Sequence, residues 1–73
     1  MIKKIKITNN KARLSLRDTT NGCEYPFIEV PEGAQCPDGA VAAVGGALSF
    51  IDDVGDVVNI YKGSRGFEVV DED

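Results

Sequence analysis

The stretch KIKITNNKARLSL, residues 4–16, decides the fold class because it holds two runs in which apolar and polar residues alternate. Ile5 and Ile7 alternate with lysines in the first run, and residues 12–18 continue the alternation in the second. A period of two is typical of a strand with one buried face. The asparagine pair between the runs favours a turn, because asparagine tolerates a positive φ. We therefore predict an antiparallel hairpin from these two runs.

More short strands follow along the chain. Residues 23–30 predict a third strand, in which Pro26 lacks an N–H for the ladder and so favours a sheet edge or a break. Residues 57–61 and 67–70 predict two further strands, and residues 62–66 have the length and glycines of a hairpin loop between them. The alternation of strand and turn signals indicates a sheet that is antiparallel throughout.

The middle of the chain allows two interpretations. Residues 31–39 hold two prolines and two glycines and predict a loop. Residues 40–44 form either a short helix capped by Asp38 or a buried strand before the turn at Gly45 and Gly46. We favour strands on both sides of that turn, because the helix would be very short.

These segments predict an all-β fold: a small antiparallel barrel or a compact sandwich of about five to seven short strands, with one short helix as an option. A chain of 73 residues is long enough for one domain. We expect residues 1–70 to form that domain and residues 71–73 to form an acidic tail. The expected core consists of Ile5, Ile7, Leu14, Leu16, Phe27, Val44, Leu48, Phe50, Val58, Ile60 and Val69.

The charges are divided unevenly along the chain. The first 22 residues carry six bases and one acid, a sum of +5, and the remainder carries two bases and eleven acids, a sum of −9, which together give the net charge of −4. Such asymmetry suits electrostatic steering of a charged partner or contact between oppositely charged regions of two copies.

The residues that most enzymes need are missing. The chain has no histidine, so the commonest general base is lacking and neither a Ser-His-Asp nor a Cys-His arrangement can form. We expect no enzymatic activity, no catalytic residues and no cofactor. Cys23 and Cys36 are expected to be free thiols, and two cysteines without histidine are too few to bind zinc.

Two short motifs have alternative explanations in local structure. Asp52, Asp53 and Asp56 are hard oxygen ligands of the kind calcium takes, but their spacing does not match an EF-hand. Aspartates also favour turns by accepting hydrogen bonds from their own backbone, so we expect a turn and no metal site. Residues 63–66 share only letters with a phosphate loop, because no helix is predicted after them.

Two groups of residues are candidates for binding. The segment of residues 40–51 is rich in small and apolar residues, which indicates either an interface between protein chains or the core of this domain. The candidate interface residues are Ala40, Val41, Ala43, Val44, Ala47 and Leu48. The candidate charged contact face, which the predicted hairpin would align, consists of Lys4, Lys6, Arg13 and Arg17.

The sequence therefore predicts a small non-enzymatic structural or accessory protein that binds a protein partner. We expect it to self-associate as a homo-oligomer or to dock on a larger assembly, for example a virion or phage particle. One alternative is an acidic inhibitor or adaptor that occupies a basic surface of its partner. Another is a nucleic-acid binder that uses the basic N-terminal hairpin, which the overall acidity and the lack of an aromatic residue before Tyr25 disfavour.

The N-terminus has no continuous apolar region of the kind found in a signal peptide. No apolar stretch is long enough to span a bilayer. We expect a protein without membrane contact that is cytoplasmic, or released without a cleaved signal peptide.

Overall fold

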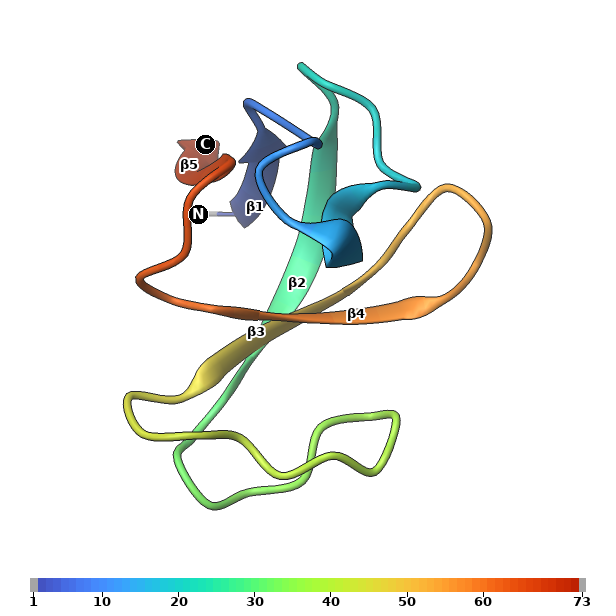
Figure 1. Cartoon of the computed structure of the whole chain (residues 1–73). Coiled ribbons are helices and arrows are strands. Elements are labelled where there is room, and N and C mark those ends of the chain that lie inside the picture. The colour runs from blue at the N-terminus through green and yellow to red at the C-terminus, as the bar shows by residue number, and fades with distance from the viewer. Residues whose placement is uncertain (1, 73) are drawn as a thin grey trace.

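The computed structural model describes residues 2–72, except for the side chains of Ile2 and Glu72. Its five strands form one antiparallel sheet in the order β4-β3-β2-β1-β5 (Figure 1). This confirms the predicted all-β antiparallel fold. The elements are β1 (Ile2–Ile7), the 3-10 helix η1 (Leu14–Leu16), β2 (Glu24–Val30), β3 (Ala47–Ile51), β4 (Val57–Tyr61) and β5 (Phe67–Glu72).

Strand β2 joins the two halves of the sheet. Its pairing with β1 ends at Pro26, and its pairing with β3 begins at Phe27, so the ladder changes partner at the proline. In Figure 1 β2 runs from β1 and β5 in the upper part of the view to β3 and β4 below. Neither predicted alternative for Pro26, an edge position or a break in the strand, is observed: β2 is the central strand and runs without interruption through the proline, where only its pairing partner changes.

The second strand of the predicted hairpin does not form. Residues 8–23 make a long connection that contains η1. The N–H groups of Leu16 and Arg17 donate to the carbonyls three residues earlier, at 3.1 and 3.2 Å. In a turn with three residues per revolution, residues i and i+2 point in different directions. Leu16 is therefore fully buried whereas Leu14 is 86% exposed, although both belonged to the predicted apolar face.

One main core lies between the two halves of the sheet. Burial of this apolar surface is the largest stabilising contribution to a domain of this size. The predicted core residues Leu14, Val44 and Val69 are exposed instead, since Val44 lies in a turn and Val69 on an edge strand. The main core consists of Ile5, Ile7, Leu16, Tyr25, Leu48, Phe50, Val58 and Ile60, with Phe27 and Phe67 packed against it.

Residues 31–46 form a second, smaller core with the ends of β2 and β3. Neither the helix nor the strand considered for residues 40–44 is present, and only an isolated bridge joins Gln35 to Val41. Gly46 has a φ of +83°, and a Cβ there would lie 2.9 Å from the carbonyl oxygen of Val30. Only glycine suits this position. The second core contains Val30, Cys36, Ala42 and Ala47, with Ala34 packed against them.

The last two strands do not form the predicted hairpin. β4 and β5 lie at opposite edges of the sheet, and residues 62–66 carry the chain from one edge to the other. β5 pairs with the whole of β1 and includes Asp71 and Glu72, which the sequence places in the tail. Asp73 lies outside the described residues.

The two thiols are free, with Cys23 exposed just before β2 and Cys36 buried in the second core. Over residues 2–72 the structure has no helix with the length and apolar character needed to cross a membrane.

Candidate functional site

Among the strands that the structure describes, β4 has a neighbour on one side only, which is β3. In an antiparallel pair, residues that directly face each other exchange backbone hydrogen bonds at every second position. The N–H of Asp52 donates to the carbonyl of Asp56 at 3.0 Å, and this pair has the register of the β3–β4 ladder. Counting along β4 from this pair shows which residues direct their backbone groups away from β3: Val57, Asn59 and Tyr61.

Most of these outward backbone groups have no partner. Within residues 2–72 no hydrogen bond involves the N–H of Val57, Asn59 or Tyr61, or the carbonyls of the first two. The carbonyl of Tyr61 accepts a hydrogen bond from the N–H of Ser64 at 3.0 Å. A row of unpaired backbone groups at a sheet edge is a template for another strand.

A groove of about 460 Å³ runs along this edge. On one side lies η1, which contacts β4. Leu14 of this helix and Arg17, the residue that follows it, line the groove. On the other side lies Asp38, from the segment of residues 31–46 that forms part of the second core. Figure 1 shows η1 above β4 and this segment below it. The open edge is therefore framed by an exposed leucine and by charged side chains.

The side chain of Asn59 is fixed at the centre of the edge. Its Oδ1 accepts a hydrogen bond from the Ser49 hydroxyl, and its Nδ2 donates to Asp38 Oδ2 at 2.8 Å. Asp38 Oδ1 also accepts from the N–H of Ala40 at 3.0 Å. The bond from Ala40, followed by that from Asn59, holds the pKa of Asp38 below its ordinary value. These contacts engage the side chain of Asn59 and leave its outward backbone groups open.

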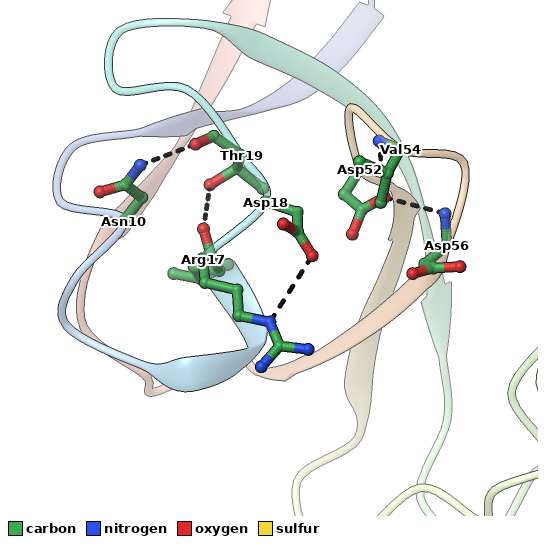
Figure 2. A network of polar contacts seen from close by, with 8 residues as sticks. Asn10, Arg17, Asp18, Thr19, Asp52, Val54 and Asp56 are labelled. Atoms are coloured by element: carbon green, nitrogen blue, oxygen red, sulfur yellow. Dashed lines mark hydrogen bonds and ion pairs between the residues drawn. The ribbon is translucent and has the colours of Figure 1, made fainter.

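Three carboxylates gather beside the end of the groove. Carboxylate oxygens of Asp18, Asp52 and Asp56 lie within 4.8 Å of one another. Asp52 Oδ1 accepts hydrogen bonds from the N–H groups of Val54 and Asp56 at 3.1 and 2.8 Å, which confirms the predicted turn. Arg17 Nε lies 3.6 Å from Asp18 Oδ2. Figure 2 shows Asp18 between Arg17 and this turn.

Asp53, the third member of the aspartate motif, points elsewhere. It accepts hydrogen bonds from the Thr20 hydroxyl at 2.7 Å and from the Tyr25 hydroxyl at 2.8 Å. These bonds, with that from Thr20 the stronger influence, lower the pKa of Asp53, and burial is the main cause that raises the pKa of Tyr25. Asp18 takes the place of Asp53 in the cluster. Sequence spacing could not reveal this, because Asp18 comes from the connection between β1 and β2.

The predicted charged contact face is divided between elements. Lys4 and Lys6 lie on β1, whereas Arg13 and Arg17 flank η1, and the hairpin that would have aligned them is absent. Lys6 stands opposite acidic residues in both neighbouring strands. Arg13 Nη1 donates to the Ser64 hydroxyl at 3.1 Å, which links the η1 connection to the segment after β4.

The predicted interface residues are also separated. Ala47 belongs to the second core and Leu48 to the main core, so neither presents a surface. The other four are exposed in the segment of residues 31–46: Ala40, Val41, Ala43 and Val44.

A second groove lies on the outer face of the sheet next to β4. It has a volume of about 230 Å³ and is mainly apolar, and its lining includes Ile28, Pro37, Ile51 and Val57. Ile28 and Ile51 are each more than half exposed. Since Val57 lines both grooves, apolar surface continues from the outer face to the β4 edge.

Comparisons of this chain with protein-family models, curated proteins and solved structures found no match. The function must therefore be inferred from the chain's own geometry.

Proposed function

We propose that this protein is a non-enzymatic binding module that joins another protein chain by adding a strand to its β4 edge. The observation that carries the proposal is the row of outward backbone groups on Val57, Asn59 and Tyr61, which lie along a groove without partners among the described residues. In strand addition, main-chain hydrogen bonds supply affinity and contacts to alternate side chains supply specificity.

The surroundings of the edge favour a particular kind of strand. Val57 is half-buried and Tyr61 is 46% exposed, so apolar side chains on the incoming strand would cover them. Asp18, Asp38 and Asp56 line the groove, with Arg17 as the one base in the lining. The incoming segment should therefore be extended and apolar, with one or more basic residues. Both the predicted acidic adaptor, which would bind a basic partner, and the predicted self-association could use this same edge.

A synthetic strand tests the proposal independently of any natural partner. The probe is a peptide of about nine alternating valine and lysine residues, long enough to cover β4. It is titrated into ¹⁵N-labelled protein, and amide shifts are followed by NMR. The matched control replaces each valine by proline, which keeps the charge but removes the donors needed for a ladder.

We expect the valine–lysine peptide to shift the amides of Val57, Asn59 and Tyr61, and the control peptide to leave them unchanged. Shifts confined to β5, equal shifts with both peptides, or no shifts up to roughly 1 mM peptide would contradict the proposal.

A further inference from the structure

The geometry points to a second copy of this protein as the chain that occupies the β4 edge, in a pair with two-fold symmetry centred on Asn59. This inference rests on the proposed function of the edge and names its partner. The β4 strand and its flanks read GDVVNIYKG, residues 55–63. When this segment is placed antiparallel to itself around Asn59, its two halves complement each other position by position.

The backbone parity of β4 suits this arrangement. A two-fold axis can pass through a hydrogen-bonded pair only if the central residue directs its N–H and carbonyl to the open edge, as Asn59 does. Val57 then faces Tyr61 of the second copy, and both of these residues also direct their backbone groups outward. Asn59 can exchange both backbone hydrogen bonds with Asn59 of the second copy, and the Tyr61 N–H can donate to the Val57 carbonyl. The Tyr61 carbonyl already accepts from Ser64 and offers its second lone pair to the Val57 N–H of the second copy.

Side chains opposite each other in this register are also compatible. The β-branched Val57 faces the aromatic Tyr61 of the second copy on the outer face of the sheet, a favourable kind of cross-strand pair. The glycines at positions 55 and 63 face each other beyond the strand ends. Leu14, which is 86% exposed on the wall of the groove, lies where a second copy would shield it.

The charges that flank β4 complete the pair. The register sets Asp56 opposite Lys62 of the second copy, and symmetry repeats this contact. Asp56 lies in the carboxylate cluster, in which Asp18 has an ion pair with Arg17. Lys62 has an ion pair with Glu29 at 4.0 Å, and both side chains are exposed, so this contact is weak and easily exchanged. The pairing thus brings a cation to an acidic cluster twice in each dimer.

The other edge of the sheet does not offer the same match. On β5, Glu68 and Asp71 are exposed, and pairing β5 with itself would concentrate negative charge along the contact. Like charges across a strand pair are unfavourable. The symmetric contact is therefore expected at β4 and not at β5.

Sedimentation equilibrium of the intact chain over a range of concentrations tests this inference, with charge reversals as the decisive variants. The wild type should approach twice the monomer mass as its concentration rises. Asp56→Lys and Lys62→Asp should each raise the dissociation constant about tenfold, because symmetry makes each change act at two contacts. The double variant should return to near the wild-type value, since the reversed charges again face each other.

Two matched variants test whether a change in dimerisation comes from the Asp56–Lys62 contact or from other charges on the protein. Glu29→Gln removes the internal partner of Lys62 and should leave dimerisation unchanged or stronger, and Glu68→Lys on β5 should have little effect on it. Far-UV circular dichroism confirms that each variant is folded. Asp56 and Lys62 are both exposed, so their substitution should be tolerated.

A monomer at every concentration would overturn the second-copy inference. If the valine–lysine peptide still shifted β4 in that monomer, strand addition would stand and only the partner would be wrong. A dimer whose mass is unchanged by the single reversals, or not restored in the double variant, would overturn this register. Assemblies that grow beyond a dimer would overturn the symmetry and indicate pairing between different edges.

Discussion

The two edges of the sheet differ in what they present to solvent. Both β4 and β5 have backbone groups that face away from the sheet, but β5 carries acids at positions 68 and 71 whereas β4 carries no charge between Val57 and Tyr61. Charged side chains on an edge strand discourage contact with other chains. This difference supports the proposal that another chain pairs with β4 and not with β5.

The two edges also differ in how they are supported. β5 is held by its pairing with the whole of β1. β4 is flanked by the η1 connection, which is itself joined to the β3–β4 turn by the bond from the Asp53 N–H to the Asp18 carbonyl at 3.1 Å. The open edge therefore depends on tertiary contacts that can be broken one at a time.

The largest expected change in the free energy of unfolding comes from replacing Leu16 in η1, and Leu14 in the same helix serves as its control. Leu16→Ala should destabilise the protein by about 2–5 kcal/mol, because it leaves a cavity in the main core. Leu14→Ala should change stability by no more than about 0.5 kcal/mol, since its side chain is exposed. Urea unfolding measures both values. Equal losses for the two variants would show that η1 does not orient these side chains as described.

A smaller loss of stability is expected when the Tyr25 hydroxyl is removed. This hydroxyl links the η1 connection to the β3–β4 turn through two hydrogen bonds. This hydroxyl accepts a hydrogen bond from the N–H of Thr20 at 3.0 Å and donates to Asp53. Tyr25→Phe should cost about 1 kcal/mol, as expected for a network of this kind. The ring contact with Phe50, at a centroid distance of 5.3 Å, should persist in the variant.

The raised pKa of Tyr25 adds a pH dependence to the same variant. Because the folded protein holds the phenol proton more tightly than the unfolded chain, this contribution to stability is complete below the unfolded value of 10.0 and declines as the pH rises above it. Thermal melts in alkaline buffers should show a steeper loss for the wild type than for Tyr25→Phe. Parallel losses would exclude the tyrosine as their source.

Asp53 should produce the opposite dependence on the acid side. Its folded pKa is lowered, so its stabilising contribution is present above the ordinary value of 3.8 and is lost as the pH falls through the folded pKa. Asp53→Asn should therefore have a shallower acid limb in thermal melts than the wild type. Glu68→Gln on β5 serves as the control, and an acid limb that is unchanged in Asp53→Asn would argue against this role.

The smallest effect on stability, together with a clear effect on binding, should come from placing a lysine on either edge strand. Tyr61→Lys on β4 and Val69→Lys on β5 replace side chains that are 46% and 48% exposed, so each should cost about 1 kcal/mol or less. Only the β4 variant should weaken dimerisation and peptide binding. Equal losses of binding in both variants would remove the distinction between the edges.

Much of the strand content could be predicted from the sequence, because alternation at Ile5 and Ile7 and the apolar runs of β3 and β4 reflect local geometry. The alternation at Leu14 and Leu16 was misleading, since a 3-10 turn can carry the same letters while pointing the two side chains apart. The glycines of residues 62–66 predicted a hairpin loop. Gly66 instead allows the backbone of Asn9 to pass close by, because a Cβ at position 66 would lie 2.6 Å from the Asn9 carbonyl oxygen.

The candidate site could not be predicted from the sequence, for a different reason. Whether a strand is central or at an edge depends on which strands pair, and the separation of β4 from β5 leaves β4 open. The approach of Asp18 to Asp52 likewise depends on the path of the η1 connection. The one signal present in the sequence was the complementarity of residues 55–63 around Asn59, which acquires meaning only once β4 is known to be an edge.

Amide hydrogen exchange measured at several protein concentrations tests the central claim most directly. The outward amides of Val57, Asn59 and Tyr61 on β4 should exchange more slowly as the concentration rises. The outward amides of Phe67, Val69 and Asp71 on β5 should exchange at a rate that does not depend on concentration. Exchange that is equally fast at both edges and independent of concentration would contradict the assignment of β4 as the docking edge.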